Sequence, residues 1–261
     1  MRGMTGKVYL VGAGPGDPEL LTLKAVRLLG AANVVLHDAL VSPEVLAMIS
    51  PGAEIINVGK RAGQKLLTQD EINALLVSYG RTRSTVVRLK GGDPTIFGRA
   101  GEEIEALRAA GIEYEIVPGI SAALGAAAVA GISLTDRRVA SQILLTTFSR
   151  GTDGSVMDWG SVTSTTTLVL YMPGADYAEV SERLLAGGLP ADLPCVIVAH
   201  ATDSRQQVRW SSVARLAGEE KLPAPALLIV GRVASHDVEN ISAQFWGTNR
   251  RDSRVERTSI S

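Results

Sequence analysis

The sequence is short of cysteine, histidine and net charge, and each shortage excludes a class of site. Cys195 is the only cysteine, so no internal disulfide and no site with several cysteine ligands is possible. The three histidines, His37, His200 and His236, lack a metal-ligand spacing, so we expect no metal. The 26 basic and 27 acidic side chains leave a net charge of -1, which gives no general attraction for nucleic acid or a membrane surface.

Long apolar runs are also scarce. The longest uncharged run is residues 116–135, IVPGISAALGAAAVAGISLT, which has the length of a membrane span. Its alanines, glycines and serines, with Pro118 near the start, favour a closely packed core helix instead. The first residues lack the apolar segment of a secretory signal, and a lone cysteine suits a reducing compartment, so we expect a cytoplasmic location.

The first half of the chain alternates short β-branched runs with amphipathic segments. Asp17, Ser42 and Thr68 each stand where a helix cap is expected, and the helix after Thr68 should reach about Tyr79. Strands alternating with helices predict a largely parallel sheet with helices on both faces. The predicted strands are residues 8–11, 33–36, 54–58, 85–89 and 113–117.

A second α/β region follows Pro118 and the small-residue helix. Its predicted strands are residues 143–148, 167–171, 195–199 and 226–230, with helices near 176–186 and 212–218. We therefore predict an N-terminal α/β domain over residues 1–120, a C-terminal α/β domain over 121–235, and a poorly ordered tail over 236–261.

Two glycine-rich turns follow predicted strands. In the first, GAGPGD (12–17), Pro15 removes an amide donor and Asp17 replaces the third glycine of a dinucleotide fingerprint, so contact with a neutral or cationic ligand is favoured over a pyrophosphate. A purely structural turn remains an alternative for it. In the second, GGDP (91–94), Asp93 is either a helix cap or an acceptor for a ligand amine or hydroxyl. Ligands of open α/β sheets bind at this carboxyl edge, which favours a binding site.

Charged residues gather at the same predicted edge. Asp38 directly follows one strand, and Lys60 and Arg61 follow the next. Together with Arg88, Lys90 and Arg99 these cations are predicted to form a cationic rim for a polycarboxylate or phosphate, the alternative for each being an ordinary solvated loop charge. The acidic residues of the following helix, Glu102, Glu103 and Glu105, are expected to form a solvated face or to stabilise its first turn.

Eight motifs in colinear order, from about Lys7 to Val233, resemble the tetrapyrrole methylase family, in particular its members that methylate uroporphyrinogen III. These motifs are VYLVGAGPGDPELLTLKAVRLL, ANVVLHDALVSPEVL, VGKRAG, TQDEIN, VRLKGGDPTIFGRAGEE, VPGIS, AGISLT and LVLYMPG. The resemblance implies two α/β domains with S-adenosylmethionine in the cleft between them, and a homodimer. It implies methyl transfer to C2 and C7 of uroporphyrinogen III, giving precorrin-2 for siroheme or cobalamin synthesis.

The resemblance also implies the residues of the site. The proton acceptor would be Asp38 and the proton donor Lys60. Because the substrate carries many carboxylates, Arg61, Arg88 and Arg137 are expected to bind it. The implied cofactor contacts are Pro15, Gly91, Gly92, Asp93, Ile96, Ser121, Ala122, Met172, Ala201 and Ala226.

Departures from the family pattern fall near the predicted domain junction and on the substrate side. Asp136 stands where the family usually has histidine, and Ala122 lacks a hydroxyl that is usual there. These changes leave open a methyltransferase that acts on a later corrin-ring precursor. A nicotinamide-dependent oxidoreductase and a ligand-binding module without catalysis are the alternatives from other classes.

Overall fold

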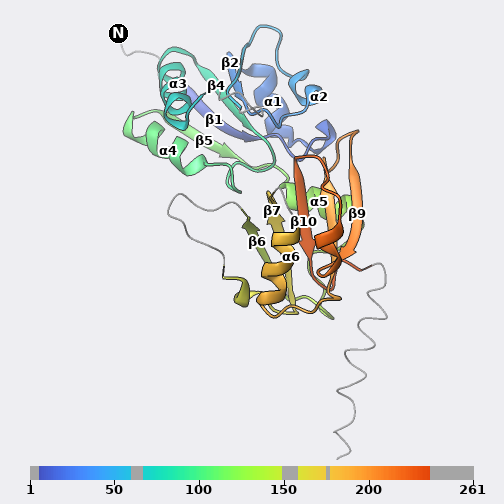
Figure 1. Cartoon of the computed structure of the whole chain (residues 1–261). Helices are drawn as coiled ribbons and strands as arrows, with labels where there is room; N and C mark the ends of the chain where they lie inside the picture. The colour runs from blue at the N-terminus through green and yellow to red at the C-terminus, as the bar shows by residue number, and fades with distance from the viewer. Residues whose placement is uncertain (1–5, 60–66, 149–157, 175–176, 236–261) are drawn as a thin grey trace, which may run out of the picture. The chain divides into compact units, whose positions relative to one another are not determined.

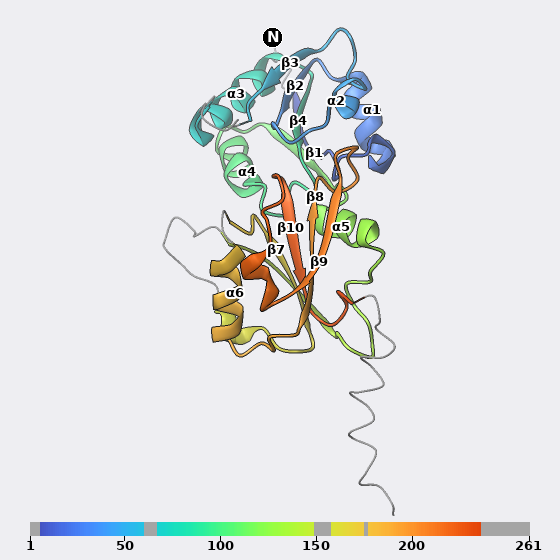
Figure 2. The ribbon, with the colours of Figure 1, turned by 45° about the vertical axis from the view of Figure 1, so that its right-hand side comes forward.

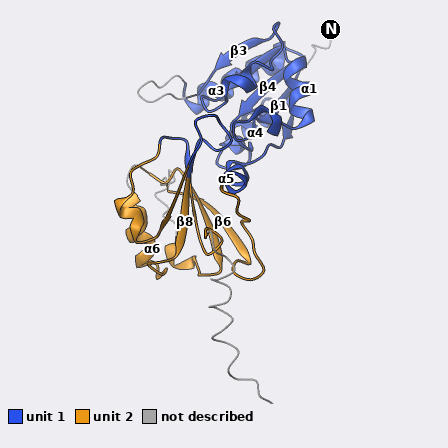
Figure 3. Ribbon diagram, turned by 90° about the vertical axis from the view of Figure 1, so that its right-hand side faces the viewer, with its two compact units in different colours: residues 1–129, 198–207, 223–226 blue, residues 130–197, 208–222, 227–261 orange. Residues whose placement is uncertain are grey.

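The computed structural model describes residues 6–59, 67–148, 158–174 and 177–235. The chain forms two compact units (Figure 3). The first contains residues 1–129, 198–207 and 223–226, and the second contains residues 130–197, 208–222 and 227–261. The predicted domain boundary between residues 120 and 121 and the predicted tail stay predictions, and residues 236–261 lie outside the described part.

The first unit is built on a parallel five-stranded sheet of order β3-β2-β4-β1-β5, so the predicted parallel sheet is confirmed. Central β4 pairs with β1 on one side and with β2 on the other, and Gly12 lies opposite Lys90 at the carboxyl edge. The strands are β1 (Lys7–Gly12), β2 (Val34–His37), β3 (Glu54–Asn57), β4 (Thr85–Lys90) and β5 (Glu113–Val117).

Five α-helices follow these strands or lie between them, and side-chain caps begin several of them. They are α1 (Leu23–Ala31), α2 (Pro43–Leu46), α3 (Gln69–Thr82), α4 (Ala100–Ala109) and α5 (Ala122–Ala130). The predicted capping box at Thr68 and the cap at Ser42 are present. The prediction that Asp17 caps the first α-helix is wrong, because Asp17 caps the 3-10 helix η1 (Pro18–Leu20) and Thr22 accepts a hydrogen bond from the amide of Ala25 to begin α1.

Alternate residues of the buried strands divide the core of this unit into two layers. Val87 and Leu89 of β4 pack with residues of α1 and α2 on one face of the sheet. Val86 packs with Ile72, Leu76 and Leu107 of α3 and α4 on the other face. Figures 1 and 2 show these helix pairs on opposite sides of the sheet. Because side chains alternate along a strand, Arg88 and Lys90 lie on the same face of β4 as Val86. The sheet face under α3 and α4 therefore changes from apolar to charged toward the carboxyl edge.

The second sheet has the order β6-β7-β10-β8-β9 and is mixed, with β6 parallel and β10 antiparallel to β7. Helix α6 (Tyr177–Ala186) packs beside it (Figure 2). The strands are β6 (Gln142–Thr147), β7 (Thr166–Tyr171), β8 (Pro194–Ala199), β9 (Gln207–Ser212) and β10 (Ala226–Val230). The sequence missed β9, and the helix predicted near 212–218 is a 3-10 helix, η3 (Arg215–Gly218), which like η2 (Trp159–Ser161) is short.

The uncharged run of residues 116–135 does not form one helix. It contains the end of β5, the turn at Pro118 and Gly119, and α5, which has nine residues. Across the described residues, no helix has the length and apolar character that a membrane crossing requires.

Candidate functional site

The two glycine-rich turns lie side by side at the carboxyl edge of the first sheet. The amide of Gly92 donates to the carbonyl of Gly14 at 2.8 Å, and the amide of Gly14 donates to the carbonyl of Gly92 at 3.2 Å. This antiparallel bridge joins the loop after β1 to the loop after β4. Gly14 and Gly92 have φ values of 70° and 66°, a left-handed backbone that favours glycine.

Glycines also allow the loop after β5 to pack directly on the other two. A Cβ on Gly119 would lie 2.4 Å from the carbonyl oxygen of Gly92, and a Cβ on Gly12 would lie 2.6 Å from the Cα of Gly119. Gly91 differs, because a Cβ there would meet only the Cβ of Leu40, at 3.3 Å. Three loops are therefore packed main chain to main chain, whereas among the described residues Gly91 faces only the side chain of Leu40.

Asp93 fastens two of these loops together. Its Oδ1 accepts hydrogen bonds from the amide of Thr95 at 2.8 Å and from its hydroxyl, and its Oδ2 accepts one from the amide of Gly119 at 3.0 Å. Burial opposes the charge of the carboxylate, but these hydrogen bonds hold the pKa of Asp93 below its usual value. Asp93 closes the local turn but is not a helix cap, because α4 begins at Ala100 with Arg99 at its N-cap position, and one lone pair of Oδ2 is left for a further donor.

Neighbouring side chains fix the first glycine-rich loop on both sides. The hydroxyl of Ser42 donates to the carbonyl of Gly16 at 2.8 Å, and the amide of Asp17 donates to the hydroxyl of Thr202 at 3.1 Å. The ring of Pro15 packs on α5, where a Cβ on Gly125 would lie 2.7 Å from the Cβ of Pro15. The loop is thus pre-formed, and no sequence pattern indicated that Thr202 would help to hold it.

Nearly all of the predicted cofactor residues belong to the first unit. Nine of the ten lie there: Pro15, Gly91, Gly92, Asp93, Ile96, Ser121, Ala122, Ala201 and Ala226. Met172 belongs to the second unit, where it follows β7 and is 52% exposed. Five described residues other than glycine have positive φ, and all lie within three residues of a predicted cofactor contact: Phe97, Arg99, Met172, His200 and Thr202. Such strain is common at ligand-binding sites.

The predicted cationic rim is wrong for Arg88 and Lys90, since each is only 2% exposed. Arg88 donates to Asp38 at 2.5 Å and to Glu103 at 3.0 Å, and Lys90 donates to Glu103 at 2.9 Å. The expectation that Glu103 belongs to a solvated face is also wrong, because Glu103 is completely buried. Arg99 is exposed as predicted, although it is paired with Glu102. We call Asp38, Arg88, Lys90 and Glu103 the buried charge cluster.

Burial and charge act together on the titration of the two cations in this cluster. Burial disfavours the charge of Arg88, but the carboxylates of Asp38 and Glu103 raise the pKa of Arg88 above its ordinary value. Burial, aided by the neighbouring guanidinium, lowers the pKa of Lys90 although Glu103 opposes the shift. The two positive side chains are thus matched within the protein by two carboxylates.

Asp38, the predicted proton acceptor, directly follows β2. Its amide donates to the carbonyl of Leu89 at 3.1 Å, and its side chain remains 29% exposed. The loop after β3 reaches the same place, because a Cβ on Gly59 would lie 2.0 Å from the amide nitrogen of Ala39. Lys60 and Arg61, the predicted proton donor and one predicted substrate contact, lie outside the described residues.

Arg137 lies in a tight turn of the second unit. Asp136 and Ala140 form an isolated bridge there, and the carboxylate of Asp136 accepts from the amide and the guanidinium of Arg138. The hydrogen bonds from Arg138 hold the pKa of Asp136 at about 2. The carboxylate of Asp136 is therefore engaged in hydrogen bonds within the turn, while Arg137 is exposed.

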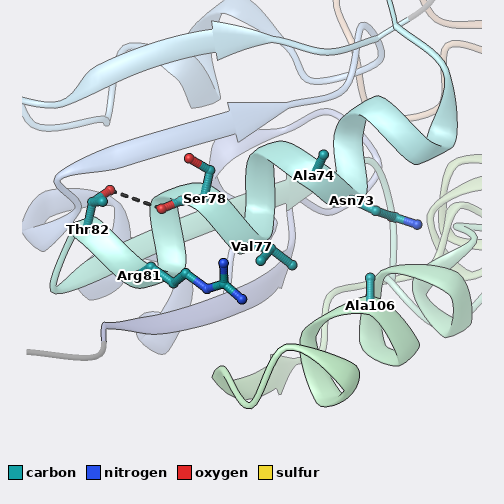
Figure 4. A pocket seen from close by; sticks show the side chains of 7 residues that line it. All are labelled: Asn73, Ala74, Val77, Ser78, Arg81, Thr82 and Ala106. Atoms are coloured by element: carbon teal, nitrogen blue, oxygen red, sulfur yellow. Dashed lines mark hydrogen bonds between the residues drawn. The ribbon is translucent and has the colours of Figure 1, made fainter. Parts of the chain in front are cut away.

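A groove of about 450 Å³ lies elsewhere, between α3 and α4 (Figure 4). Its lining includes Asn73, Val77 and Arg81 of α3 and Ala106 of α4, and no predicted site residue. In the part of the chain that the structure describes, no group of three or more His, Cys, Asp and Glu side chains could hold a metal ion.

Comparison with known proteins gives one consistent result. The family model of Tetrapyrrole (Corrin/Porphyrin) Methylases matches residues 7–217. The chain is 49% identical to the uroporphyrinogen-III C-methyltransferase of Paracoccus denitrificans over 235 residues, covering 88% of this chain and 82% of that protein. It is 47% identical to the siroheme synthase of Gluconobacter oxydans over 239 residues, covering 90% of this chain but only 50% of that protein.

A solved structure with the same fold contains a ligand. The uroporphyrin-III C-methyltransferase of Thermus thermophilus, complexed with S-adenyl homocysteine, matches with a TM-score of 0.76 and 39% identity. The match covers 87% of this chain and 98% of that one.

Proposed function

The chain belongs to the tetrapyrrole (corrin/porphyrin) methylase family, and from that membership we propose that it transfers methyl groups from S-adenosylmethionine to C2 and C7 of uroporphyrinogen III. The product would be precorrin-2, a precursor for siroheme or cobalamin. The observation that carries the proposal is the carboxyl edge of the first sheet, where the glycine loops are packed main chain to main chain and Gly91 faces, among the described residues, only the side chain of Leu40. The similarity to a methyltransferase complexed with S-adenyl homocysteine supports the same ligand here.

The residues present suit this cofactor. Gly91 and Gly92 let a ligand approach the main chain, and Asp93 retains acceptor capacity for an amine or a hydroxyl. Pro15 offers no amide and Asp17 is acidic, which suits a cationic sulfonium better than a pyrophosphate. We therefore propose that the ten residues predicted from the sequence hold the cofactor: Pro15, Gly91, Gly92, Asp93, Ile96, Ser121, Ala122, Met172, Ala201 and Ala226.

When bound, the cofactor supplies an electrophilic methyl group on a sulfonium. A pyrrole carbon of the reduced macrocycle forms the new carbon–carbon bond while the sulfur–methyl bond breaks, so the protein mainly has to align the two reactants. The methylated ring then loses a proton to restore neutrality. We propose that Asp38 accepts a proton in this reaction and that Lys60 donates one, a type of assistance worth about a hundredfold to ten-thousandfold. The contact of Gly59 with Ala39 supports the pairing of these two residues.

The substrate is a polycarboxylate, so we propose that exposed cations bind it. We propose this role for Arg137 and Arg61, the two other arginines predicted from the sequence to bind substrate. Arg88 was predicted to join them, but it is buried against Asp38 and Glu103, so any contribution to substrate binding passes through those partners. The homodimer and the cytoplasmic location also stay proposals, supported by the family resemblance and the single cysteine.

The test is an anaerobic incubation of the full chain with uroporphyrinogen III and S-adenosylmethionine labelled in the methyl group. We expect label in the tetrapyrrole and its absence with Asp38→Asn, whose fold is checked by binding of S-adenosylhomocysteine. No label in uroporphyrinogen III would overturn the proposal. Label appearing only in a later corrin-ring precursor would instead favour that alternative substrate.

A further inference from the structure

We propose that Glu103 is a positioning residue for the methyl transfer: its buried carboxylate fixes Arg88, and Arg88 fixes the carboxylate of Asp38. The inference rests on the proposed function, because Asp38 is the proposed base. Glu103 touches neither reactant in this scheme. It acts on the reaction through the guanidinium.

The hydrogen bonds of Arg88 leave it little freedom to move. Its Nε donates to Glu103, its Nη1 donates to the carbonyls of Leu36 at 3.4 Å and Leu89 at 3.2 Å, and its Nη2 donates to Oδ1 of Asp38. Four of the five N–H donors of a guanidinium are thus engaged. A side chain anchored at three points sets both the place and the plane of the carboxylate that it holds.

The structure leaves the two oxygens of Asp38 in different situations. Oδ1 accepts from Arg88, whereas no hydrogen bond from another described residue reaches Oδ2. The side chain is 29% exposed although Arg88 is buried. One oxygen is therefore held from inside the protein, and the other keeps its acceptor capacity as far as the described residues are concerned.

A buried glutamate at position 103 is not the residue that would stabilise the fold most. Its Oε1 accepts from both Arg88 and Lys90 and, at 3.5 Å, from Gln69, while its buried Oε2 has no partner among the described residues. Buried ion pairs with unsatisfied atoms often contribute less stability than apolar side chains of the same size. The presence of a carboxylate at this position of α4 is explained if Glu103 is needed to hold Arg88 in place.

The charges facing Asp38 come from several elements, and they define the test. Arg88 and Lys90 of β4 are balanced by Asp38 itself and by Glu103 of α4. His37 lies next in sequence, and its Nδ1 contacts the carbonyl of Asp38. Near the start of α4, the exposed Arg99 pairs with Glu102 and also interacts with the charges of Glu103 and Asp70.

The decisive experiment compares two substitutions of opposite charge in the labelled-methyl assay. Glu103→Gln removes a negative charge and Lys90→Met removes a positive one at nearly constant side-chain volume. Glu103→Gln should lower kcat about tenfold to a hundredfold, since small misplacements of catalytic groups have effects of this size, while KM for S-adenosylmethionine changes less than about twofold. The double variant restores the balance of charge.

The acid limb of the pH–rate profile should shift in opposite directions in the two variants. Extra positive charge near a carboxylate favours its ionised form, so Glu103→Gln should move the limb to lower pH and Lys90→Met to higher pH, each by on the order of half a unit. The double variant should return the limb toward its wild-type position. Leu107→Ala is the matched control, because it removes buried apolar atoms from the same face of α4 without touching the cluster. It should lower stability and leave the profile in place.

These results separate the inference from the function on which it rests. A wild-type chain that transfers no methyl group to uroporphyrinogen III refutes the proposed function. If the wild type is active but both charge variants keep its kcat and its profile, or both shift the profile in the same direction, Glu103 is merely structural. Should Glu103→Gln fail to fold, Lys90→Met alone decides by the direction of its shift.

Discussion

A methyl group added at Gly91 should weaken cofactor binding without unfolding the protein. In Gly91→Ala, the new Cβ would meet only the Cβ of Leu40, at 3.3 Å, and Leu40 lies in a loop with 64% of its surface exposed. Leu40 can therefore yield by a few tenths of an ångström. Gly91 does not have a positive φ, so alanine also adds no backbone strain.

The expected magnitudes follow from these contacts. The small crowding is offset by a gain of about 0.4–1 kcal/mol from the reduced freedom of the unfolded chain. The melting temperature should then change by less than about 4 °C. A cofactor lying against Gly91 would instead be overpacked by about 1–3 kcal/mol, which corresponds to a rise in Kd of about 5-fold to 150-fold.

Isothermal titration calorimetry with S-adenosylhomocysteine measures that Kd directly. Gly101→Ala is the matched control, because a Cβ at this exposed position in the first turn of α4 would meet nothing within 4 Å. It should leave Kd unchanged. An unaltered Kd for Gly91→Ala, with its fold intact, would show that the cofactor does not approach the main chain at the end of β4.

Two other changes test the packing of the glycine loops in the first unit and an ion pair in the second. Gly119→Ala should lower the free energy of unfolding by about 1–3 kcal/mol or more, because its Cβ would lie 2.4 Å from a carbonyl oxygen that cannot move away. Urea denaturation measures this loss. A variant as stable as the wild type would contradict the packing of the three loops. Asp136→Asn should be less stable than the wild type at neutral pH. Because the pKa of Asp136 is lowered from 3.8 to about 2 by Arg138, the stabilisation is present above about pH 4 and is lost as the pH falls toward 2. Denaturation curves across this range should converge at the acid end, and a difference independent of pH would exclude this ion pair as the cause.

The strands and the meeting of the glycine-rich turns follow from local pattern. The β-branched runs predict β1 to β5, and glycine after a buried strand indicates a turn whatever the rest of the chain does. Asp17 and Thr22 show the limit of such local signals, because both are good caps and only the extended backbone at Leu21 decides which one begins α1.

The burial of Glu103 could not be predicted from its own helix. A glutamate in the first turn is usually solvated, and its environment here depends on residues 13 and 15 positions earlier in β4. A usable signal was nevertheless present. Arg88 and Lys90 alternate in a strand with apolar neighbours, which places two cations on one buried face and requires carboxylates nearby. The role of Thr202 had no such signal, since it comes from a turn 185 residues away from its partner.

The contact of Gly12, Gly92 and Gly119 has a practical consequence for altering the donor that this protein accepts. A surface made of peptide groups has no rotamers, so it cannot reshape itself around a sulfonium carrying a bulkier transferable group. If the cofactor binds there as proposed, redesign for such analogues would have to trim side chains beside it instead, and Leu40, which lies against Gly91, is the natural first choice.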